Sequence, residues 1–180
     1  MIKPLSVPAA SKAVKVYHAR VFLFNNEVIM NWNVYLSGEI HSDWREQIAT
    51  GIKSADLPVT LSAPVTDHAS SDDCGDNILG SEKDPFWKDH KASKINAIRT
   101  RKLIEEADVV VVRFGDKYKQ WNAAFDAGFA AALGKAMIVL HDPELTHALK
   151  EVDAAALAVA QTPAQVVDIM KYVINGQLPA

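Results

Sequence analysis

The chain has 180 residues, of which 49% are hydrophobic and 23% charged, and it carries a net charge of -3. Length and composition are those of a single globular domain with its own core. The acidic balance argues against nucleic acid as the main partner, and no apolar run reaches the ~18 residues needed to cross a bilayer. One cysteine, Cys74, leaves no internal disulfide, so the expected location is the cytoplasm.

The first 29 residues differ in composition from the rest of the chain. Basic residues and prolines precede the first acidic residue, Glu27; they are Lys3, Pro4, Pro8, Lys12, Lys15 and Arg20. Both an organelle-targeting peptide and an over-extended start, with the working protein beginning at Met30, fit this pattern. We expect residues 1–29 to be a poorly packed extension and residues 30–180 to form the single domain.

Short apolar segments separated by helix signals predict the five strands of one sheet. They lie at residues 33–37, 58–62, 108–113, 136–141 and 156–160. A continuous apolar run such as Val109–Val112 is typical of a central parallel strand, which is buried on both faces. The alternation of strands and helices predicts a doubly wound α/β fold with a parallel sheet, flavodoxin-like or Rossmann-like, in the strand order 2-1-3-4-5.

Helices are expected between these strands and after the last one. The first follows a cap at Ser42 or Asp43, and others are expected at about 92–106, 120–133 and 142–152. The last helix has the clearest boundaries. Thr162 is its N-cap, Pro163 its first residue, and Gln165 completes a capping box, while Asn175–Gly176 ends it.

A long polar segment at about 64–90 is expected to be a loop. It holds several potential metal ligands, namely Asp67, His68, Asp72, Asp73, Cys74 and Asp76. Their spacing matches neither an EF-hand nor a zinc signature, so a solvated lid is favoured over a metal site. The chain also has no G-x-G-x-x-G or P-loop motif, and we predict no metal and no cofactor.

The most informative single residue is Asp126. It is the only charge between Lys119 and Lys135, on a predicted helix that is apolar on nearly every face and therefore expected to be buried. A buried carboxylate costs several kcal/mol unless it is hydrogen-bonded or paired. Two interpretations follow: a structural acid paired with an arginine or a backbone amide, or a catalytic carboxylate near the carboxyl end of a strand.

Residues after the first and third strands are the other candidates, because these strand ends meet at the switch point of the sheet. They are Ser37, Gly38, Glu39, His41, Asp116, Trp121 and Asn122, and Arg45, Arg99 and Thr100 are added as helix residues. The arginines are expected counter-ions of a buried acid. Structural roles are also open: Gly38 as a plain turn, Trp121 as a packing residue at the helix start, and Asn122 as a partner of Asp126 one turn away.

These segments resemble a known family. The stretch Asp126–Lys135 is similar to the nucleophile motif of nucleoside 2-deoxyribosyltransferases, in which Glu precedes x-Gly-x-Ala and a Gly-Lys pair. Residues 34–41, 42–45 and 117–122 resemble the YtoQ-like branch, and the likeness covers about residues 31–172. Asp126 is one methylene shorter than the family Glu, and Thr100 and Gln120 stand where the family has acids.

The resemblance implies a reaction, partners and a quaternary state. The reaction is N-glycosidic cleavage through a covalent glycosyl-enzyme intermediate, with transfer to another base or to water, on a small nucleoside or nucleotide. A homo-oligomer is also implied. We therefore expect an enzyme in which Asp126 is the nucleophile, Asn122 orients it or the sugar, Trp121 stacks on the base and the Gly38 backbone binds phosphate or hydroxyls. The alternative is a non-catalytic nucleotide- or sugar-binding module that kept the pocket.

Overall fold

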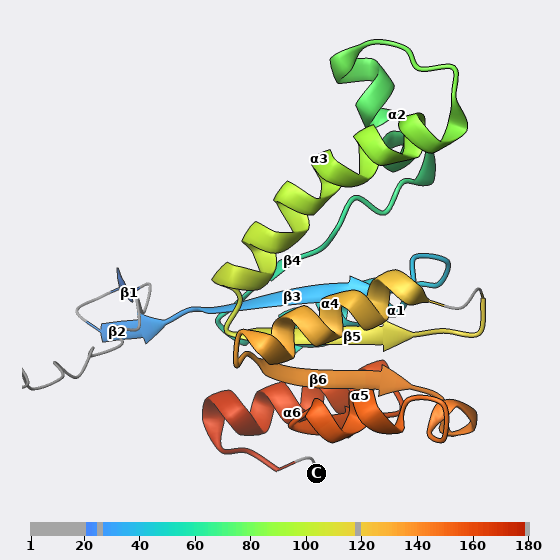
Figure 1. Cartoon of the computed structure of the whole chain (residues 1–180). Helices are drawn as coiled ribbons and strands as arrows, with labels where there is room; N and C mark the ends of the chain where they lie inside the picture. The colour runs from blue at the N-terminus through green and yellow to red at the C-terminus, as the bar shows by residue number, and fades with distance from the viewer. Residues whose placement is uncertain (1–20, 25–26, 118–119, 179–180) are drawn as a thin grey trace, which may run out of the picture.

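A parallel five-stranded sheet forms the centre of the computed structural model, which describes residues 21–24, 27–117 and 120–178 (Figure 1). The strand order is β4-β3-β5-β6-β7. The strands are β3 (Trp32–Gly38), β4 (Val59–Ser62), β5 (Val109–Phe114), β6 (Ala136–His141) and β7 (Ala158–Ala160). All four neighbouring pairs are parallel, which confirms the predicted fold and strand order.

Helices cover both faces of this sheet, as a doubly wound fold requires. On one face α1 (Trp44–Ser54) and α6 (Pro163–Asn175) pack on side chains such as Leu36, Val111 and Leu140. On the other face α4 (Trp121–Ala132) packs on the alternate residues Tyr35, Val110, Val112, Met137 and Val139. Burial on both faces explains why the central strands are continuous apolar runs.

The predicted boundaries of α6 are confirmed. The Thr162 hydroxyl accepts a hydrogen bond from the Gln165 backbone N–H at 3.2 Å, and the Gln165 side chain accepts one from the Thr162 N–H. Gly176 ends the helix in the left-handed conformation, with φ of 70°. The helix predicted at 142–152 is instead a 3-10 turn at Pro143–Leu145 followed by α5 (Lys150–Ala155).

The segment predicted as a loop at 64–90 is mostly helical, so this prediction was wrong. It forms α2 (His68–Leu79) and the beginning of α3 (Pro85–Glu106), which starts well before residue 92. Asp67 caps α2 by accepting from the Ser70 N–H at 2.8 Å, and Asp84 caps α3 by accepting from the Phe86 N–H at 2.9 Å.

Helix α2 and the adjacent part of α3 form a helical arm that extends away from the sheet (Figure 1). The two helices approach closely at Gly75, where a Cβ would lie 2.7 Å from the Ala92 backbone nitrogen. A Lys91–Asp76 ion pair at 3.3 Å and a hydrogen bond from Asn96 to the Ser71 carbonyl link them further.

Part of the amino-terminal extension forms a separate antiparallel hairpin of β1 (Val21–Phe24) and β2 (Glu27–Met30). Sequence analysis assigned no strand there. Residues 1–20 lie outside the described part of the chain, so poor packing of residues 1–29 stays a prediction. Within the described ranges, no helix combines the length and the hydropathy that crossing a membrane demands.

Candidate functional site

Asp126 lies where the sheet reverses its strand order, between β3 and β5. Its Oδ2 accepts a hydrogen bond of 2.6 Å from the hydroxyl of Ser37, a fully buried residue near the carboxyl end of β3. The parallel register pairs Ser37 with Val112 of β5, which places this contact at the switch point. The structure thus brings together two residues that are 89 positions apart and that sequence analysis had placed in one site.

The Asp126 carboxylate is partly buried, and no cation among the described residues pairs with it. Burial raises the pKa of this carboxyl above its ordinary range, and the hydrogen bond from Ser37 opposes that rise. Within the described ranges, no lysine, arginine or histidine forms an ion pair with Asp126. The interpretation of Asp126 as the buried partner of an arginine therefore does not match the structure.

A cleft of about 610 Å³ opens in front of Asp126. Helix α4 and the tip of β3 form its base, α3 and α2 form the opposite wall, and the segment after β4 closes one side. Among the predicted site residues, those that line it are Gly38, Arg99, Thr100, Asn122 and Asp126. Ligand sites of α/β proteins are found at this edge of the sheet.

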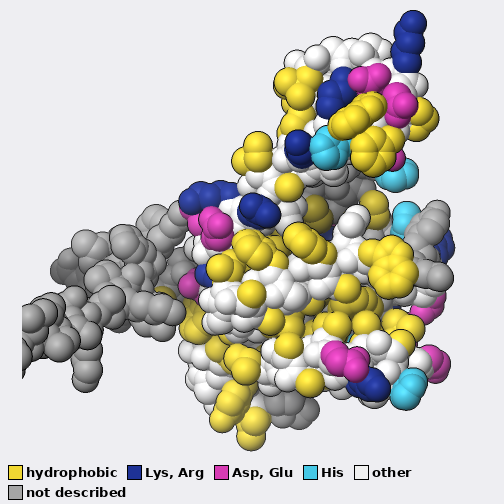
Figure 2. All heavy atoms as spheres, viewed as in Figure 1, with side chains coloured by type: hydrophobic (Ala, Val, Ile, Leu, Met, Phe, Trp, Pro, Cys, Tyr) yellow, Lys and Arg dark blue, Asp and Glu magenta, His cyan; other side chains and the backbone are white. Residues whose placement is uncertain are grey.

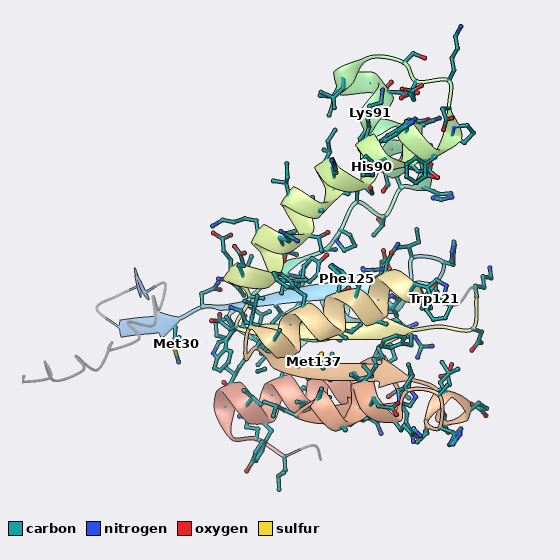
Figure 3. All side chains as sticks on the ribbon, viewed as in Figure 1. Met30, His90, Lys91, Trp121, Phe125 and Met137 are labelled. Carbon is teal, nitrogen blue, oxygen red and sulfur yellow. The ribbon has the colours of Figure 1, made fainter. Side chains whose placement is uncertain are left out.

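Two aromatic side chains of α4, Phe125 and Phe129, line the cleft as well. Phe125 is 65% exposed and lies on the stretch of α4 next to α3, whereas Trp121 is at the start of the helix (Figure 3). Trp121 is 72% exposed and is not part of the cleft lining, so Phe125 is better placed than Trp121 to contact a base. The expectation that α4 is buried on nearly every face was also wrong, because its aromatic residues reach solvent.

Arg45 has a structural role rather than a place in the cleft. Its buried guanidinium donates hydrogen bonds to three backbone carbonyls, those of Leu36 at 3.1 Å, Gly38 at 3.0 Å and Glu39 at 2.6 Å. It also lies 4.4 Å from the centre of the Trp44 ring. Burial lowers the pKa of Arg45 from its ordinary value. Arg45 therefore holds the loop after β3 in shape; it does not line the cleft, and no ion pair joins it to Asp126 in the described part of the chain.

The glycine at position 38 is required by a close backbone contact. Its φ is +103°, and a Cβ at this position would lie 2.1 Å from the carbonyl oxygen of Arg113 in β5. Only glycine fits such a conformation at such a distance. Gly38 lines the cleft with its backbone alone. The close packing of β3 on β5 is one reason why a glycine is needed at this position.

The other predicted loop residues lie outside the cleft lining. Glu39 is 5% exposed, and its carboxylate accepts hydrogen bonds from the His41 backbone N–H and from the Ser42 hydroxyl at 2.6 Å. Glu39 thus organises its own loop. His41 and Asp116 are exposed, and neither is among the residues that line the cleft.

Tyr35 is a site residue that sequence analysis missed. It is fully buried, and its hydroxyl forms no hydrogen bond of normal geometry with any described residue. Burial raises the pKa of Tyr35 to about 12; the neighbouring Thr100 hydroxyl opposes this rise and the charge of Asp126 adds to it. Tyr35 was treated only as part of a core strand. Its spacing of two from Ser37 puts both on the face of β3 that α4 covers, and this was the available signal.

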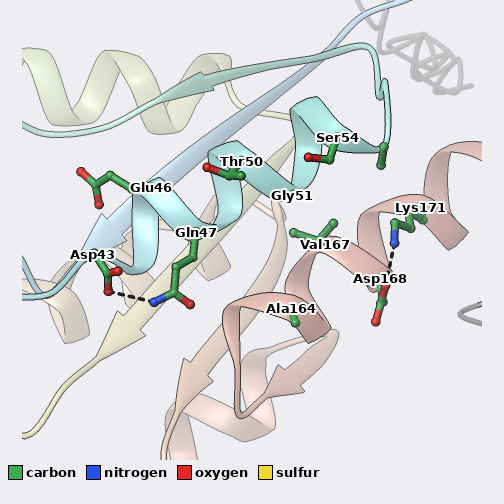
Figure 4. Close-up of a pocket in the computed structure, with 11 residues that line it drawn as sticks. Asp43, Glu46, Gln47, Thr50, Gly51, Ser54, Ala164, Val167, Asp168 and Lys171 are labelled. Carbon is green, nitrogen blue, oxygen red and sulfur yellow. Dashed lines mark hydrogen bonds and ion pairs between the residues drawn. The ribbon is translucent and has the colours of Figure 1, made fainter.

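A second hollow, of about 650 Å³, lies between α1 and α6 on the opposite face of the sheet (Figure 4). Four of its polar side chains are paired: Gln47 donates to Asp43 at 2.8 Å, and Lys171 pairs with Asp168 at 3.1 Å. Val167 packs against Gly51 at its base. The hollow is a weaker candidate than the Asp126 cleft, because it holds no buried carboxylate like Asp126 among the residues that line it.

The acidic residues of the segment 67–76 do not converge on a point. They are distributed along α2, and several pair with neighbours, as Asp73 does with Lys88 at 2.7 Å. Across residues 21–24, 27–117 and 120–178, no group of three or more His, Cys, Asp or Glu side chains is placed to hold a metal ion.

Comparison with known proteins places this chain in a family. The family model described as "Nucleoside 2-deoxyribosyltransferase YtoQ" matches residues 35–174. The chain belongs to the YtoQ family. A curated member, the uncharacterized protein YtoQ of Bacillus subtilis (strain 168), is 44% identical over 148 residues, which are 82% of this chain and 100% of that protein. The match to the YtoQ family contains every residue that lines the cleft and excludes the β1–β2 hairpin.

Solved structures share the fold of this YtoQ-family chain at low sequence identity. A conserved protein from Enterococcus faecalis V583 is 15% identical with a TM-score of 0.56, over 79% of this chain and 99% of that one. A 2-deoxyribosyltransferase from Bacillus psychrosaccharolyticus is 14% identical with a TM-score of 0.46, over 76% and 90% of the two chains. The first of these supports the α/β architecture.

Proposed function

We propose that this protein breaks the N-glycosidic bond of a nucleoside-type substrate, with Asp126 as the nucleophile, and passes the sugar to water or to a second base. The observation that carries the proposal is a carboxylate in a cleft that is bonded to Ser37 and has no cationic partner among the described residues. A partly buried carboxylate without a cationic partner lowers the stability of the fold, and a catalytic role of Asp126 would explain why the chain has one here. The name of the YtoQ family supports the class of reaction.

The first step replaces one bond to the sugar by another. An Asp126 carboxylate oxygen bonds to the anomeric carbon as the bond from that carbon to the base nitrogen breaks, and the nitrogen keeps the electron pair and gains a proton. The negative charge of Asp126 stabilises the positive charge that develops on the sugar. Water or a second base then attacks the anomeric carbon, and the Asp126 carboxylate leaves.

The residues around Asp126 suit this chemistry. The Ser37 hydroxyl fixes one oxygen, Oδ2, and leaves Oδ1 for attack. The Tyr35 hydroxyl has the Thr100 hydroxyl as its neighbour and no hydrogen bond of normal geometry among the described residues, so it can donate to the carboxylate or to a sugar hydroxyl once substrate is bound. Asn122 and Thr100 offer polar contacts to the sugar from α4 and α3, and Phe125 offers an apolar surface to the base.

A non-catalytic nucleotide- or sugar-binding module remains the rival, favoured by the replacement of family acids with Thr100 and Gln120. The deciding assay is release of free base from a panel of nucleosides and nucleotides, with mass spectrometry of the protein for a glycosyl adduct on the peptide that contains Asp126. Release together with the adduct supports the enzyme. Binding of a panel member without release or adduct favours the module.

The pH dependence of turnover gives a test of the Ser37 contact. Turnover needs the ionised carboxylate, and the pKa of Asp126 is raised, so activity should fall at a pH above the ordinary aspartate value of 3.8. In Ser37→Ala the hydrogen bond that lowers this pKa is lost. The acid limb of the pH–rate profile should therefore move to higher pH than in the wild type. An unmoved limb with reduced kcat would show that Ser37 acts only by packing.

We also propose that the chain forms a homo-oligomer, as the family resemblance implies. Large apolar side chains are exposed on α4 and on the helical arm (Figure 2), including Trp121 (72%), Phe125 (65%), Leu133 (40%), Phe86 (65%), Trp87 (53%) and Ile98 (72%). Exposed apolar patches of this kind mark interaction surfaces.

Sedimentation velocity tests the assembly. The wild type should sediment as an oligomer, and Leu133→Glu should shift it toward the monomer because a charge would be buried at the interface. Val173→Glu, a matched change of an exposed residue (46%) on α6, should leave the oligomer intact. A monomeric wild type at micromolar concentration would contradict the proposal.

A further inference from the structure

Two arginines of the cleft, Arg99 and Arg101, contact neutral groups in the part of the chain that the structure describes. Arg99 donates one hydrogen bond from Nη2 to the Ala63 carbonyl at 3.2 Å, and the Arg101 guanidinium carbon lies 5.9 Å from the centre of the Phe129 ring. No carboxylate in the described part of the chain forms an ion pair with either of them. Each guanidinium therefore keeps most of its five N–H donors for a ligand.

The acidic residues of the cleft do not neutralise these arginines. Asp72 lies 3.4 Å from His68 on α2, and Asp89 is ten residues before Arg99 on α3, about 15 Å along the helix axis. Asp126 is the remaining carboxylate of the lining. The lining thus carries three cations, Lys94, Arg99 and Arg101, against three carboxylates and is about neutral as a whole. None of these carboxylates forms an ion pair with Arg99 or Arg101 in the described part of the chain.

We infer that Arg99 and Arg101 bind the phosphate group of a nucleotide, so that the substrate is a nucleoside monophosphate rather than a free nucleoside. A guanidinium presents two parallel donors that match two phosphate oxygens, and such charge-assisted bonds are about twice as strong as neutral ones. The inference rests on the proposed function, because it assigns the substrate class of the same site.

The positions of the two arginines fit this assignment. Both side chains line the cleft from α3, Arg99 near Ala63 in the segment after β4 and Arg101 near Phe129 of α4. Thr100 lies between them in the sequence, and its hydroxyl neighbours Tyr35. Asp126 lies on the opposite element, α4. A phosphate held on the α3 wall therefore leaves the sugar to span the gap toward Asp126, with the base against the uncharged phenyl rings of α4. Holding the nucleotide by its phosphate at α3 and by its base at α4 would align the anomeric carbon with Asp126 for attack.

Isothermal titration calorimetry can test the assignment without turnover, using Asp126→Asn so that no substrate is consumed. Nucleosides are compared with their own 5′- and 3′-monophosphates and with ribose 5-phosphate, at low and high salt. A monophosphate should bind about 10- to 100-fold more tightly than its nucleoside, with a preference that weakens in high salt. Arg99→Gln and Arg101→Gln should each remove most of that preference, and Arg99→Lys should keep part of it.

Lys102→Gln serves as the matched control, because Lys102 is an exposed cation of the same helix that pairs with Glu106 at 3.0 Å outside the cleft lining. It should leave the preference for phosphate unchanged. Equal binding of nucleoside and monophosphate overturns the inference, as does an equal effect of the control. Free-base release from nucleosides without any preference for phosphate would overturn it too, while the proposed function would stand.

Discussion

Replacing Asp126 with asparagine is expected to abolish turnover, by on the order of 10⁴-fold or more, because the neutral amide cannot bond to the anomeric carbon. The change keeps the shape of the side chain and an acceptor for the Ser37 hydroxyl, which lies 2.6 Å from Oδ2 in the wild type. The measurement is free-base release together with the mass of the adduct, which should be missing in the variant.

The same variant should be more stable than the wild type at neutral pH. The pKa of Asp126 is raised in the folded state above the ordinary value of 3.8, so folding disfavours the ionised form. That penalty is absent below the unfolded pKa and appears as the pH rises through the folded pKa. Asp126→Asn should therefore have a higher Tm near pH 7, and the difference should vanish at pH 3.

These paired results separate the interpretations of Asp126. A structural acid that neutralised a buried cation would make Asp126→Asn less stable by about 3–5 kcal/mol, and retained turnover would remove Asp126 from the mechanism. Asp126→Glu provides a second comparison. Its extra methylene adds about 1–3 kcal/mol of strain if the site is tightly packed, but it restores the acid that the resemblance places at this position.

Replacing Arg45 with methionine is expected to destabilise the fold by about 3 kcal/mol. Three charge-assisted hydrogen bonds to the carbonyls of residues 36, 38 and 39 would be lost, and the removal of a buried charge offsets only part of that loss. Urea unfolding measures the effect. Substrate binding should persist at temperatures where the variant is folded, because Arg45 does not line the cleft.

A neighbouring residue supplies the control for this experiment. Glu46 is exposed on the same turn of α1, and Glu46→Gln should change the free energy of unfolding by less than about 0.5 kcal/mol. If Arg45→Met left stability unchanged and removed substrate binding, Arg45 would be a ligand contact after all, as its inclusion among the site candidates first suggested.

The sheet could be predicted because its signals are local and agree with one another. Continuous runs such as Val109–Val112 identify buried parallel strands, and the observed order β4-β3-β5-β6-β7 is the one that a doubly wound topology implies. The start of helix α6 could be predicted equally well, since Thr162, Pro163 and Gln165 are boundary signals that do not depend on tertiary contacts.

The helical arm was missed because its apolar pattern is weak and its stability comes from caps and tertiary pairing. Asp84 followed by Pro85 is a cap and first-turn signal of the kind recognised at α6, and it was overlooked inside a polar stretch. The close contact at Gly75 and the Lys91–Asp76 pair join residues of two helices, and such partners cannot be inferred from one segment alone.

Within the candidate site, the contact of Ser37 with Asp126 followed from topology, but the direction of other side chains did not. Arg45 and Glu39 were chosen for their charge, and both turn toward backbone groups of the loop that contains Glu39. Phe125 rather than Trp121 lines the cleft: the two residues share one face of α4, but Trp121 lies one turn away, at the start of the helix, and the position of the cleft along α4 depends on tertiary packing.

Helix α3 is anchored in the core near its C-terminal end, and most of its length lies outside the core. Its 22 residues measure about 33 Å, its buried Ile104 lies in the core, and its far end carries Phe86 and Trp87 in solvent. If the helix pivots rigidly at Ile104 by about 5°, the tip moves by about 2.5 Å but Arg99 moves by only about 0.7 Å. Such a pivot would move the α2 side of the cleft with the arm but leave Arg99 and Thr100 nearly fixed relative to Asp126.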